Sequence, residues 1–255
     1  MADESPAKPF YSVLVLAFFC SLMVAGAAVG LKPLQQENQA IDQKKNILLA
    51  ADLYDSTKPV DELFGAIETR IVDLATGKFV SEETIPPGDY NQLKAAMSDD
   101  LGRMLTKEED IAGIRRLEKY SLVYLARQQD KISQIILPIR GKGLWSTLYG
   151  YLAIDGDLTT VNGISFYQHG ETPGLGGEIE NPRWQSGWKG KQVYDTSNNK
   201  AIWIGKGKRQ LEEIHQVDGI SGATLTIDGV NDIMSFWFGE SGFQPFLSQL
   251  QNNGG

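Results

Sequence analysis

The sequence has 255 residues, 42% of them hydrophobic, and a formal net charge of −8. This length and apolar content suffice for a sizeable core in one large or two small domains, and they exclude a disordered chain. The acidic balance excludes a general nucleic-acid binder, which needs a basic face against the phosphates. With one cysteine and two histidines, the chain has no internal disulfide, and we predict no metal site.

The N-terminal segment is predicted to be a membrane anchor. No charged residue lies between Lys8 and Lys32, and residues 11–30 would span roughly 30 Å as a helix, the thickness of the hydrocarbon core of a bilayer. A cleaved signal peptide is the alternative, because residues 25–27 read AGA. Two acidic residues outweigh one lysine before the apolar run, and this favours a retained anchor. The numbers of lysines before and after the span do not decide on which side of the membrane the rest of the chain lies.

Three helices are predicted in the next part of the chain. Residues 33–54 read as a helix that leaves the membrane, and residues 88–100 read as a short helix. Residues 58–75 read as an amphipathic helix that ends at Thr76-Gly77. Its apolar stripe contains Val60, Leu63, Phe64, Ile67, Ile71 and Leu74.

From about residue 114 the pattern changes to short β-branched and aromatic runs separated by turn residues. These runs predict an antiparallel sheet with strands in residues 120–127, 132–141, 147–155 and 163–169. The predicted fold class is therefore α+β: a single transmembrane helix followed by a domain with an antiparallel sheet flanked by helices. We expect a tail and anchor at residues 1–31, a mainly helical part at 32–113 and a sheet-containing part at 114–255.

Residues 218–226, DGISGATLT, stand before apolar residues that recur at helical spacing, so a helix is predicted to begin within or just after residues 222–226. A helix N-terminus presents unpaired N–H groups and favours an anion such as phosphate. The alternative is that Ser221, Thr224 or Thr226 only caps the helix. A serine hydrolase is disfavoured, because His169 and His215 both precede Ser221, against the order that the related G-x-S-x-G motif requires.

Glycines also concentrate in the second half of the chain, with twenty of the 27 after residue 140. The segment HGETPGLGG at residues 169–177 lacks both nucleotide-binding fingerprints. It predicts either a backbone-lined surface for the flat ring of a cofactor or a plain turn. The basic side chains of the run GKGKRQ at residues 205–210 could neutralise the charge of a phosphate or could simply be solvated.

Taken together, the N-terminal span, ETPGLGG and DGISGATLT resemble the family of covalent FMN-binding subunits of the bacterial sodium-translocating NADH:quinone reductase, over essentially the full length. The resemblance implies FMN attached covalently to Thr224 through a phosphoester, installed by a flavin transferase that uses FAD. It implies an FMN-binding set of Thr224, Ser221, Gly222, Ala223, Asp218, Glu171, Thr172, Gly174, Leu175 and Gly176, with Trp145 and Lys206 as weaker members.

The resemblance also implies the function. The chain is expected to relay electrons within a six-subunit translocase of the bacterial inner membrane that oxidises NADH, reduces ubiquinone and pumps sodium. Its soluble domain is expected to be periplasmic, and the chain is expected to hold no catalytic NADH or quinone site of its own. The alternatives are the flavin subunit of an Rnf-type ferredoxin/NAD oxidoreductase and a cofactor-free, membrane-anchored interaction protein.

Overall fold

The computed structural model describes residues 7–129, 131–205 and 212–253. It forms two compact units, residues 1–42 and residues 43–255. Helix α1 (Ala7–Ala50) begins in the first unit, and its last turns belong to the second. The helices predicted for residues 11–30 and 33–54 are thus one continuous helix that includes Pro33 and ends at Ala50.

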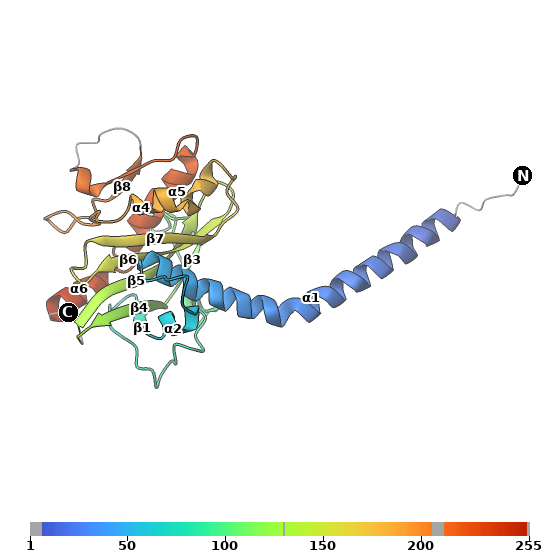
Figure 1. Ribbon diagram of the computed structural model, residues 1–255, viewed down its shortest axis with the longest axis horizontal. Helices are drawn as coiled ribbons and strands as arrows, with labels where there is room; N and C mark the ends of the chain where they lie inside the picture. Colours follow the sequence, from blue (N-terminus) through green and yellow to red (C-terminus); the bar gives the residue numbers. More distant parts are fainter. Residues whose placement is uncertain (1–6, 130, 206–211, 254–255) are drawn as a thin grey trace, which may run out of the picture. The chain divides into compact units, whose positions relative to one another are not determined.

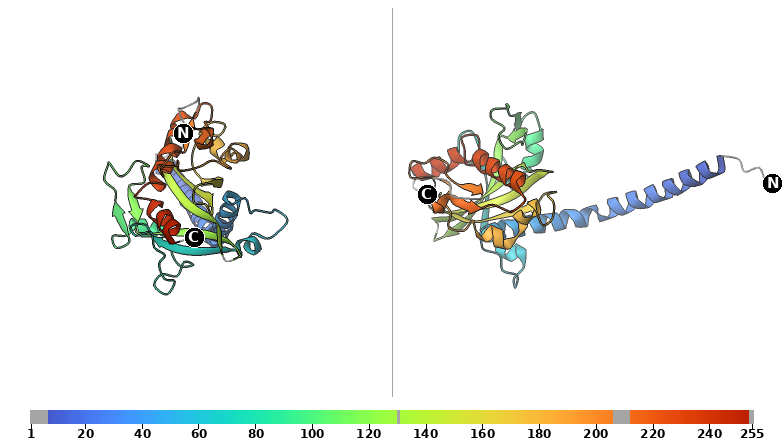
Figure 2. Two further views of the ribbon diagram at one scale, coloured as in Figure 1. Left: turned by 90° about the vertical axis from the view of Figure 1, so that its left-hand side faces the viewer. Right: turned by 90° about the horizontal axis from the view of Figure 1, so that it is seen from above.

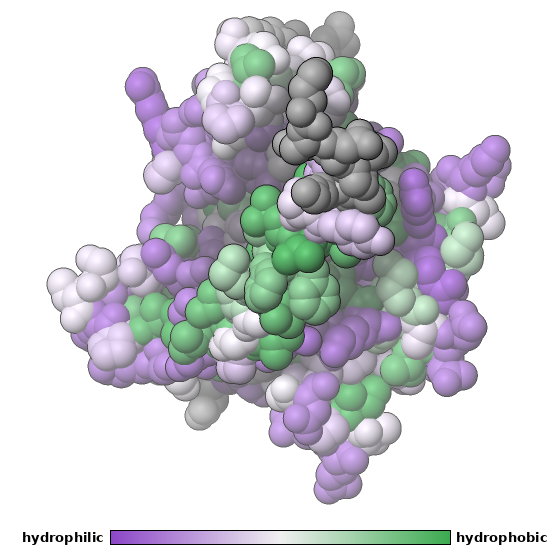
Figure 3. All heavy atoms as spheres, turned by 90° about the vertical axis from the view of Figure 1, so that its right-hand side faces the viewer, coloured by the Kyte–Doolittle hydropathy of each residue, from purple (hydrophilic) through white to green (hydrophobic). Residues whose placement is uncertain are grey.

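Residues 9–31 of α1, in the first unit, are apolar on all sides of the helix. Its large hydrophobic side chains between Phe10 and Leu34 are all exposed, and hydrophobic colouring gathers on this helix in Figure 3. Among the described residues, α1 is the one helix long and apolar enough to cross a membrane. A helix that is hydrophobic around its whole circumference needs an apolar environment, which a bilayer supplies.

The second unit is built on a five-stranded antiparallel sheet in the order β1-β4-β5-β6-β7 (Figure 1). Its strands are β1 (Ile67–Asp73), β4 (Tyr120–Gln128), β5 (Lys131–Lys142), β6 (Thr147–Asp155) and β7 (Val161–Gln168). The four predicted strands are therefore confirmed. Side chains on both faces are buried, which is why the β-branched and aromatic runs are nearly continuous.

The predicted helix at residues 58–75 is wrong. Helix α2 (Val60–Phe64) lasts five residues and ends at Gly65, and β1 follows it. Ile67 and Ile71 are buried because β1 pairs with β4, where these two residues lie opposite Ala126 and Leu122. A spacing of four residues fits one face of a strand as well as one face of a helix, and the pairing with β4 decides between them.

Each face of the sheet carries its own core. Helices α5 (Thr224–Trp237) and α6 (Gln244–Asn253) pack on one face, with Trp237, Phe243 and Phe246 fully buried. The last turns of α1 pack on the other face through Ile47 and Leu48. Figure 2 shows helices on both sides of the sheet. Helix α5 is confirmed to begin where the sequence predicts it.

Smaller elements surround this framework. The predicted short helix is confirmed as α3 (Gln92–Met97). The others are strands β2 (Gly102–Met104), β3 (Arg116–Glu118), β8 (Trp203–Gly205) and β9 (Gln216–Asp218), helix α4 (Pro182–Ser186), and the 3-10 helices η1 (Gly176–Glu180) and η2 (Glu213–His215).

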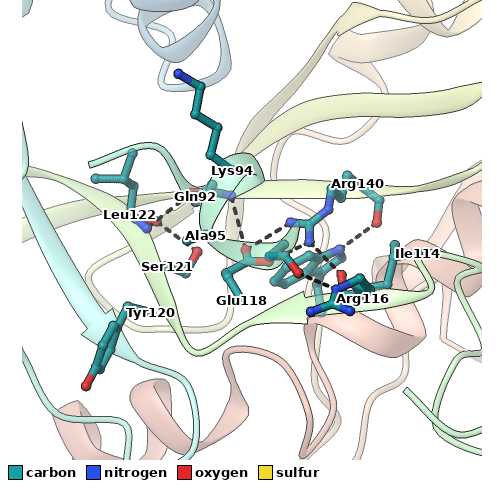
Figure 4. A network of polar contacts seen from close by, with 12 residues as sticks. Gln92, Lys94, Ala95, Ile114, Arg116, Glu118, Tyr120, Ser121, Leu122 and Arg140 are labelled. Atoms are coloured by element: carbon teal, nitrogen blue, oxygen red, sulfur yellow. Dashed lines mark hydrogen bonds and ion pairs between the residues drawn. The ribbon is translucent and has the colours of Figure 1, made fainter. Parts of the chain in front are cut away.

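A buried ion pair joins the β2–β3 hairpin to the sheet (Figure 4). The guanidinium of Arg140 on β5 donates to both oxygens of Glu118 on β3, at 2.9 and 2.5 Å, and to the carbonyl of Arg116. The amide of Gln92 also donates to Glu118, and the Trp237 indole of α5 donates to the Arg140 carbonyl. Arg140 therefore ties the hairpin, the sheet and α5 together.

Candidate functional site

Three segments that are distant in the sequence meet at a pocket of about 210 Å³. They are the turn between β5 and β6 (residues 143–146), the segment after β7 (residues 169–177) and the start of α5. The lining residues are Leu144, Trp145, Glu171, Thr172, Leu175, Gly176, Gly222, Ala223, Thr224, Leu225 and Thr226.

The pocket unites most of the site residues predicted from the sequence. Those that line it are Trp145, Glu171, Thr172, Leu175, Gly176, Gly222, Ala223 and Thr224. Asp218, Ser221 and Gly174 are not part of this lining, and Lys206 lies outside the described residues. Asp218 ends β9, and its carbonyl accepts a hydrogen bond from the Trp184 indole.

The threonines at the start of α5 differ in their exposure to solvent. Ala223 occupies the N-cap position, where it makes no side-chain capping hydrogen bond, so neither Thr224 nor Thr226 is the N-cap residue. Thr224, the first residue of the helix, is exposed and lines the pocket, whereas Thr226 is 1% exposed. The first N–H groups of a helix have no acceptors within it, so the Thr224 hydroxyl stands where an anion is favoured.

The turn before α5 requires glycine at residue 222. Gly222 has a φ of +77°, in the left-handed region that side chains disfavour. A Cβ at this position would lie 2.9 Å from Cδ2 of Leu175. Gly222 thus brings the start of α5 into contact with the segment after β7.

Glu171 joins all three segments of the pocket. One carboxylate oxygen, Oε1, accepts hydrogen bonds from the N–H groups of Trp145 and Ser146, at 2.9 and 3.3 Å. The other, Oε2, accepts from the Leu144 N–H at 3.2 Å and from the Thr226 hydroxyl at 2.6 Å. We call this arrangement of Glu171 and Thr226 the Glu171–Thr226 clamp.

The environment of the clamp keeps the carboxyl group ionised. Burial acts to raise the pKa of Glu171, but the hydrogen bonds from Thr226 and from the backbone of residues 144–146 outweigh it, so the pKa is lowered. Glu171 forms no ion pair among the described residues. Neutral donors therefore stabilise this charge.

Two further hydrogen bonds connect the loops beside the clamp. The Gly170 N–H donates to the Ser146 hydroxyl at 2.6 Å, and the Glu171 N–H donates to Nδ1 of His169 at 3.1 Å. The other ring nitrogen of His169, Nε2, lies 2.9 Å from the Glu180 carboxylate. His169 thus orients the backbone of Glu171 from behind the pocket.

The sequence analysis missed three lining residues, Leu144, Leu225 and Thr226. Leu144 and Leu225 are adjacent to predicted residues, and both are large apolar side chains with exposures of 42% and 60%. Trp145 and Leu175 are also exposed, at 71% and 44%. The pocket therefore combines an apolar rim with a hydroxyl at a helix N-terminus, which suits a ligand with a flat apolar ring and an anionic group.

Comparisons with known proteins agree with this chemistry. Residues 143–238 match the family described as FMN-binding domain, a range that includes every residue of the pocket lining. The chain is 48% identical to the NqrC subunit of the Na(+)-translocating NADH-quinone reductase of Pseudomonas aeruginosa, over 98% of this chain and 97% of that protein. It is 42% identical to the subunit of the same name from Vibrio parahaemolyticus, over 99% and 98%.

Two crystal structures share the fold. The structure of NqrC from Shewanella oneidensis superposes with a TM-score of 0.74 at 36% identity, covering 82% of this chain and 96% of that one. The structure of the same reductase subunit from Parabacteroides distasonis gives a TM-score of 0.66 at 27% identity, covering 86% and 97%. Because the chain is 48% and 42% identical to the two curated subunits over nearly its full length, it belongs to the NqrC family of subunits of the Na(+)-translocating NADH-quinone reductase.

Proposed function

We propose that Thr224 carries FMN through a covalent phosphoester. The observation that carries this proposal is the position of Thr224, which is exposed, lines the pocket and is the first residue of α5. A separate flavin transferase would supply the FMN group from FAD. The bond from the Thr224 oxygen to phosphorus forms as the phosphoanhydride of FAD breaks, AMP leaves, and the hydroxyl proton is released.

The residues at the start of α5 fit the charge of the product. A phosphodiester keeps one negative charge, and the positive end of the helix dipole with its free N–H groups favours an anion at this place. The stabilisation expected from such a helix terminus is about 0.3 to 1 kcal/mol. Gly222 and Ala223 leave little bulk next to Thr224, which gives the transferase access to the hydroxyl.

The rest of the pocket fits a flavin ring. Leu144, Trp145, Leu175 and Leu225 offer exposed apolar surface, and Thr172 and Gly176 complete the lining. Large apolar side chains that are exposed around one pocket indicate a binding surface. We assign these residues to contact with the isoalloxazine ring, and Lys206 and Gly174 remain proposed members of the site.

As a member of this family, the chain is an FMN electron-transfer subunit of the sodium-translocating NADH-quinone reductase, an oxidoreductase complex. Bound FMN supplies one- and two-electron redox chemistry. The protein holds the ring, shields part of it from water and sets its surroundings. The relatives' names and the FMN-binding match favour this function, and they give no support to an Rnf-type or a cofactor-free protein.

Further proposals concern the membrane. Helix α1 is proposed to cross the inner membrane once and to remain attached, with the second unit in the periplasm, in contact with lipid and with the other subunits. The apolar circumference of α1 supports the anchor, and the proposed maturation by a flavin transferase of the periplasm supports the orientation. Protease added to intact spheroplasts tests both, because the second unit should then be digested, and full protection would contradict the orientation.

The test of the covalent bond is Thr224→Ala in the full chain, produced together with the transferase. Intact mass and flavin fluorescence in a denaturing gel should show complete loss of FMN, while the circular dichroism spectrum is unchanged. Thr224→Ser keeps the oxygen and should retain FMN. Ser221→Ala is the matched control, because Ser221 is also exposed but lies outside the pocket lining. Fluorescence that survives in Thr224→Ala and disappears in Ser221→Ala would assign the bond to Ser221.

A further inference from the structure

The pocket contains a polar arrangement that the covalent bond to Thr224 does not require. The Glu171–Thr226 clamp connects a β-turn, a loop and a helix through four hydrogen bonds to one buried carboxylate. Thr226 is 1% exposed and its hydroxyl donates to Glu171, whereas Thr224, two residues earlier, is exposed. The two threonines of α5 therefore have separate tasks.

Two glycines keep the space that the clamp occupies. A Cβ on Gly176 would lie 2.4 Å from the Thr226 hydroxyl oxygen and 2.9 Å from Oε2 of Glu171. A Cβ on Gly143 would lie 2.7 Å from Oε1 of Glu171. Both distances to the carboxylate are shorter than real Cβ contacts, so side chains at residues 143 and 176 would displace the clamp. The close approach of three segments thus depends on this carboxylate and on the glycines around it.

The hydrogen-bonding capacity of Glu171 is already used. An ionised carboxylate offers about four lone-pair positions and no donor. Three backbone N–H groups and one hydroxyl fill them. The side chain therefore has no free position with which to bind a ligand, and its contribution to the site acts through the segments that it holds.

We propose that Glu171 and Thr226 are positioning residues that form the flavin pocket before flavin arrives, by tying residues 144–146 to the first turn of α5. This inference rests on the proposed function of the pocket. When the clamp is intact, Trp145 and Leu144 stand opposite Thr224 at a fixed separation, and the ring is held in one environment. Without it, the β5–β6 turn separates from α5, although the exposed Thr224 hydroxyl remains accessible to the transferase.

The first test uses the full chain made without the transferase, so that no flavin is attached. Hydrogen exchange of the N–H groups of residues 144–146 reports directly on the clamp. Thr226→Val removes the hydroxyl at equal size, and Glu171→Gln removes the charge. Each should lower the protection of these amides by roughly ten- to a hundredfold, the range expected for hydrogen bonds to a charged acceptor. Thr226→Ser keeps the donor and should restore protection.

The matched control is Thr160→Val. The hydroxyl of Thr160 donates to the Asp157 carboxylate at the same 2.6 Å, in a turn that does not belong to the pocket. Thr160→Val should leave the exchange protection of residues 144–146 unchanged. Unchanged protection in both Thr226→Val and Glu171→Gln, with the fold preserved, would overturn the proposal.

The second test uses the same variants with FMN attached. Thr226→Val should retain full attachment by mass but should shift the flavin midpoint potential and its visible absorption, and Thr226→Ser should return both to the wild-type values. A loss of amide protection without any change in potential or spectrum would also overturn the proposal. The clamp would then stabilise the local fold without affecting the surroundings of the flavin. The exchange experiment needs no flavin, so a wild-type chain that acquires no FMN would count against the proposed function alone.

Discussion

Glu118 and Glu171 are both buried, but their partners differ in kind. Glu118 is paired with the Arg140 guanidinium, so its charge is compensated, and the pair connects the β2–β3 hairpin to the sheet. Glu171 is held by three peptide N–H groups and one hydroxyl, and among the described residues it meets no cation. Hydrogen bonds from neutral donors solvate a charge without cancelling it. The first carboxylate therefore serves the fold, and the second leaves a negative charge beside the pocket.

The largest effect is expected when the compensated pair is broken. Arg140→Met leaves Glu118 buried without its cation, which should cost about 3 to 5 kcal/mol of unfolding free energy. Thermal or urea unfolding of the full chain in detergent measures this loss. Arg140→Met combined with Glu118→Leu should recover much of it. Asp99→Ala, which breaks the exposed pair between Arg116 and Asp99, should cost about 1 kcal/mol or less. An equal cost for both pairs would remove the distinction between them.

A smaller, pH-dependent effect is expected at Glu171. Its pKa in the folded chain is lowered relative to an unfolded value of about 4.3, so its stabilisation is present above that value and is lost as the pH falls through the folded pKa. The unfolding free energy of the wild type should exceed that of Glu171→Gln by about 1 to 3 kcal/mol near pH 7. The difference should shrink below about pH 4. Unfolding curves at several pH values measure this, and a difference that is constant across this range would show that the charge is not involved.

The smallest effect on stability is expected for Leu175→Asp, which adds a carboxylate to the pocket rim. Leu175 is 44% exposed, so the unfolding free energy should change by about 0.5 kcal/mol or less. Attachment of FMN should persist, because it depends on Thr224. A second negative charge near Glu171 disfavours the electron-rich reduced flavin, so the midpoint potential should fall, and Leu175→Met should leave it unchanged. Redox titration measures both, and equal potentials would remove Leu175 from the surroundings of the ring.

The sequence predicted the elements that local pattern determines. The apolar span, the four central strands and the start of α5 were all predictable because their signals lie within a few residues. Residues 67–73 were mistaken for helix, because pairing with β4, whose partner residues lie 47 to 59 positions later, determines their structure. The role of Thr226 was hidden for the same reason, since its partner Glu171 is 55 residues away. A hydroxyl near a helix start looks the same in sequence whether it caps the helix, carries a group or holds a distant carboxylate.

The support of α5 has a consequence for how variation in this family is interpreted. All residues that line the pocket fall within residues 143–238, the range that matches the FMN-binding domain. Strand β5 ends at Lys142, and a Cβ on Gly229 of α5 would lie 2.4 Å from the Lys142 carbonyl oxygen, so the helix rests directly on the strand. A comparison of the matched range alone would therefore omit the foundation of the site. Substitutions in residues 131–142 can alter how relatives hold their flavin while every residue of the recognisable motifs stays the same.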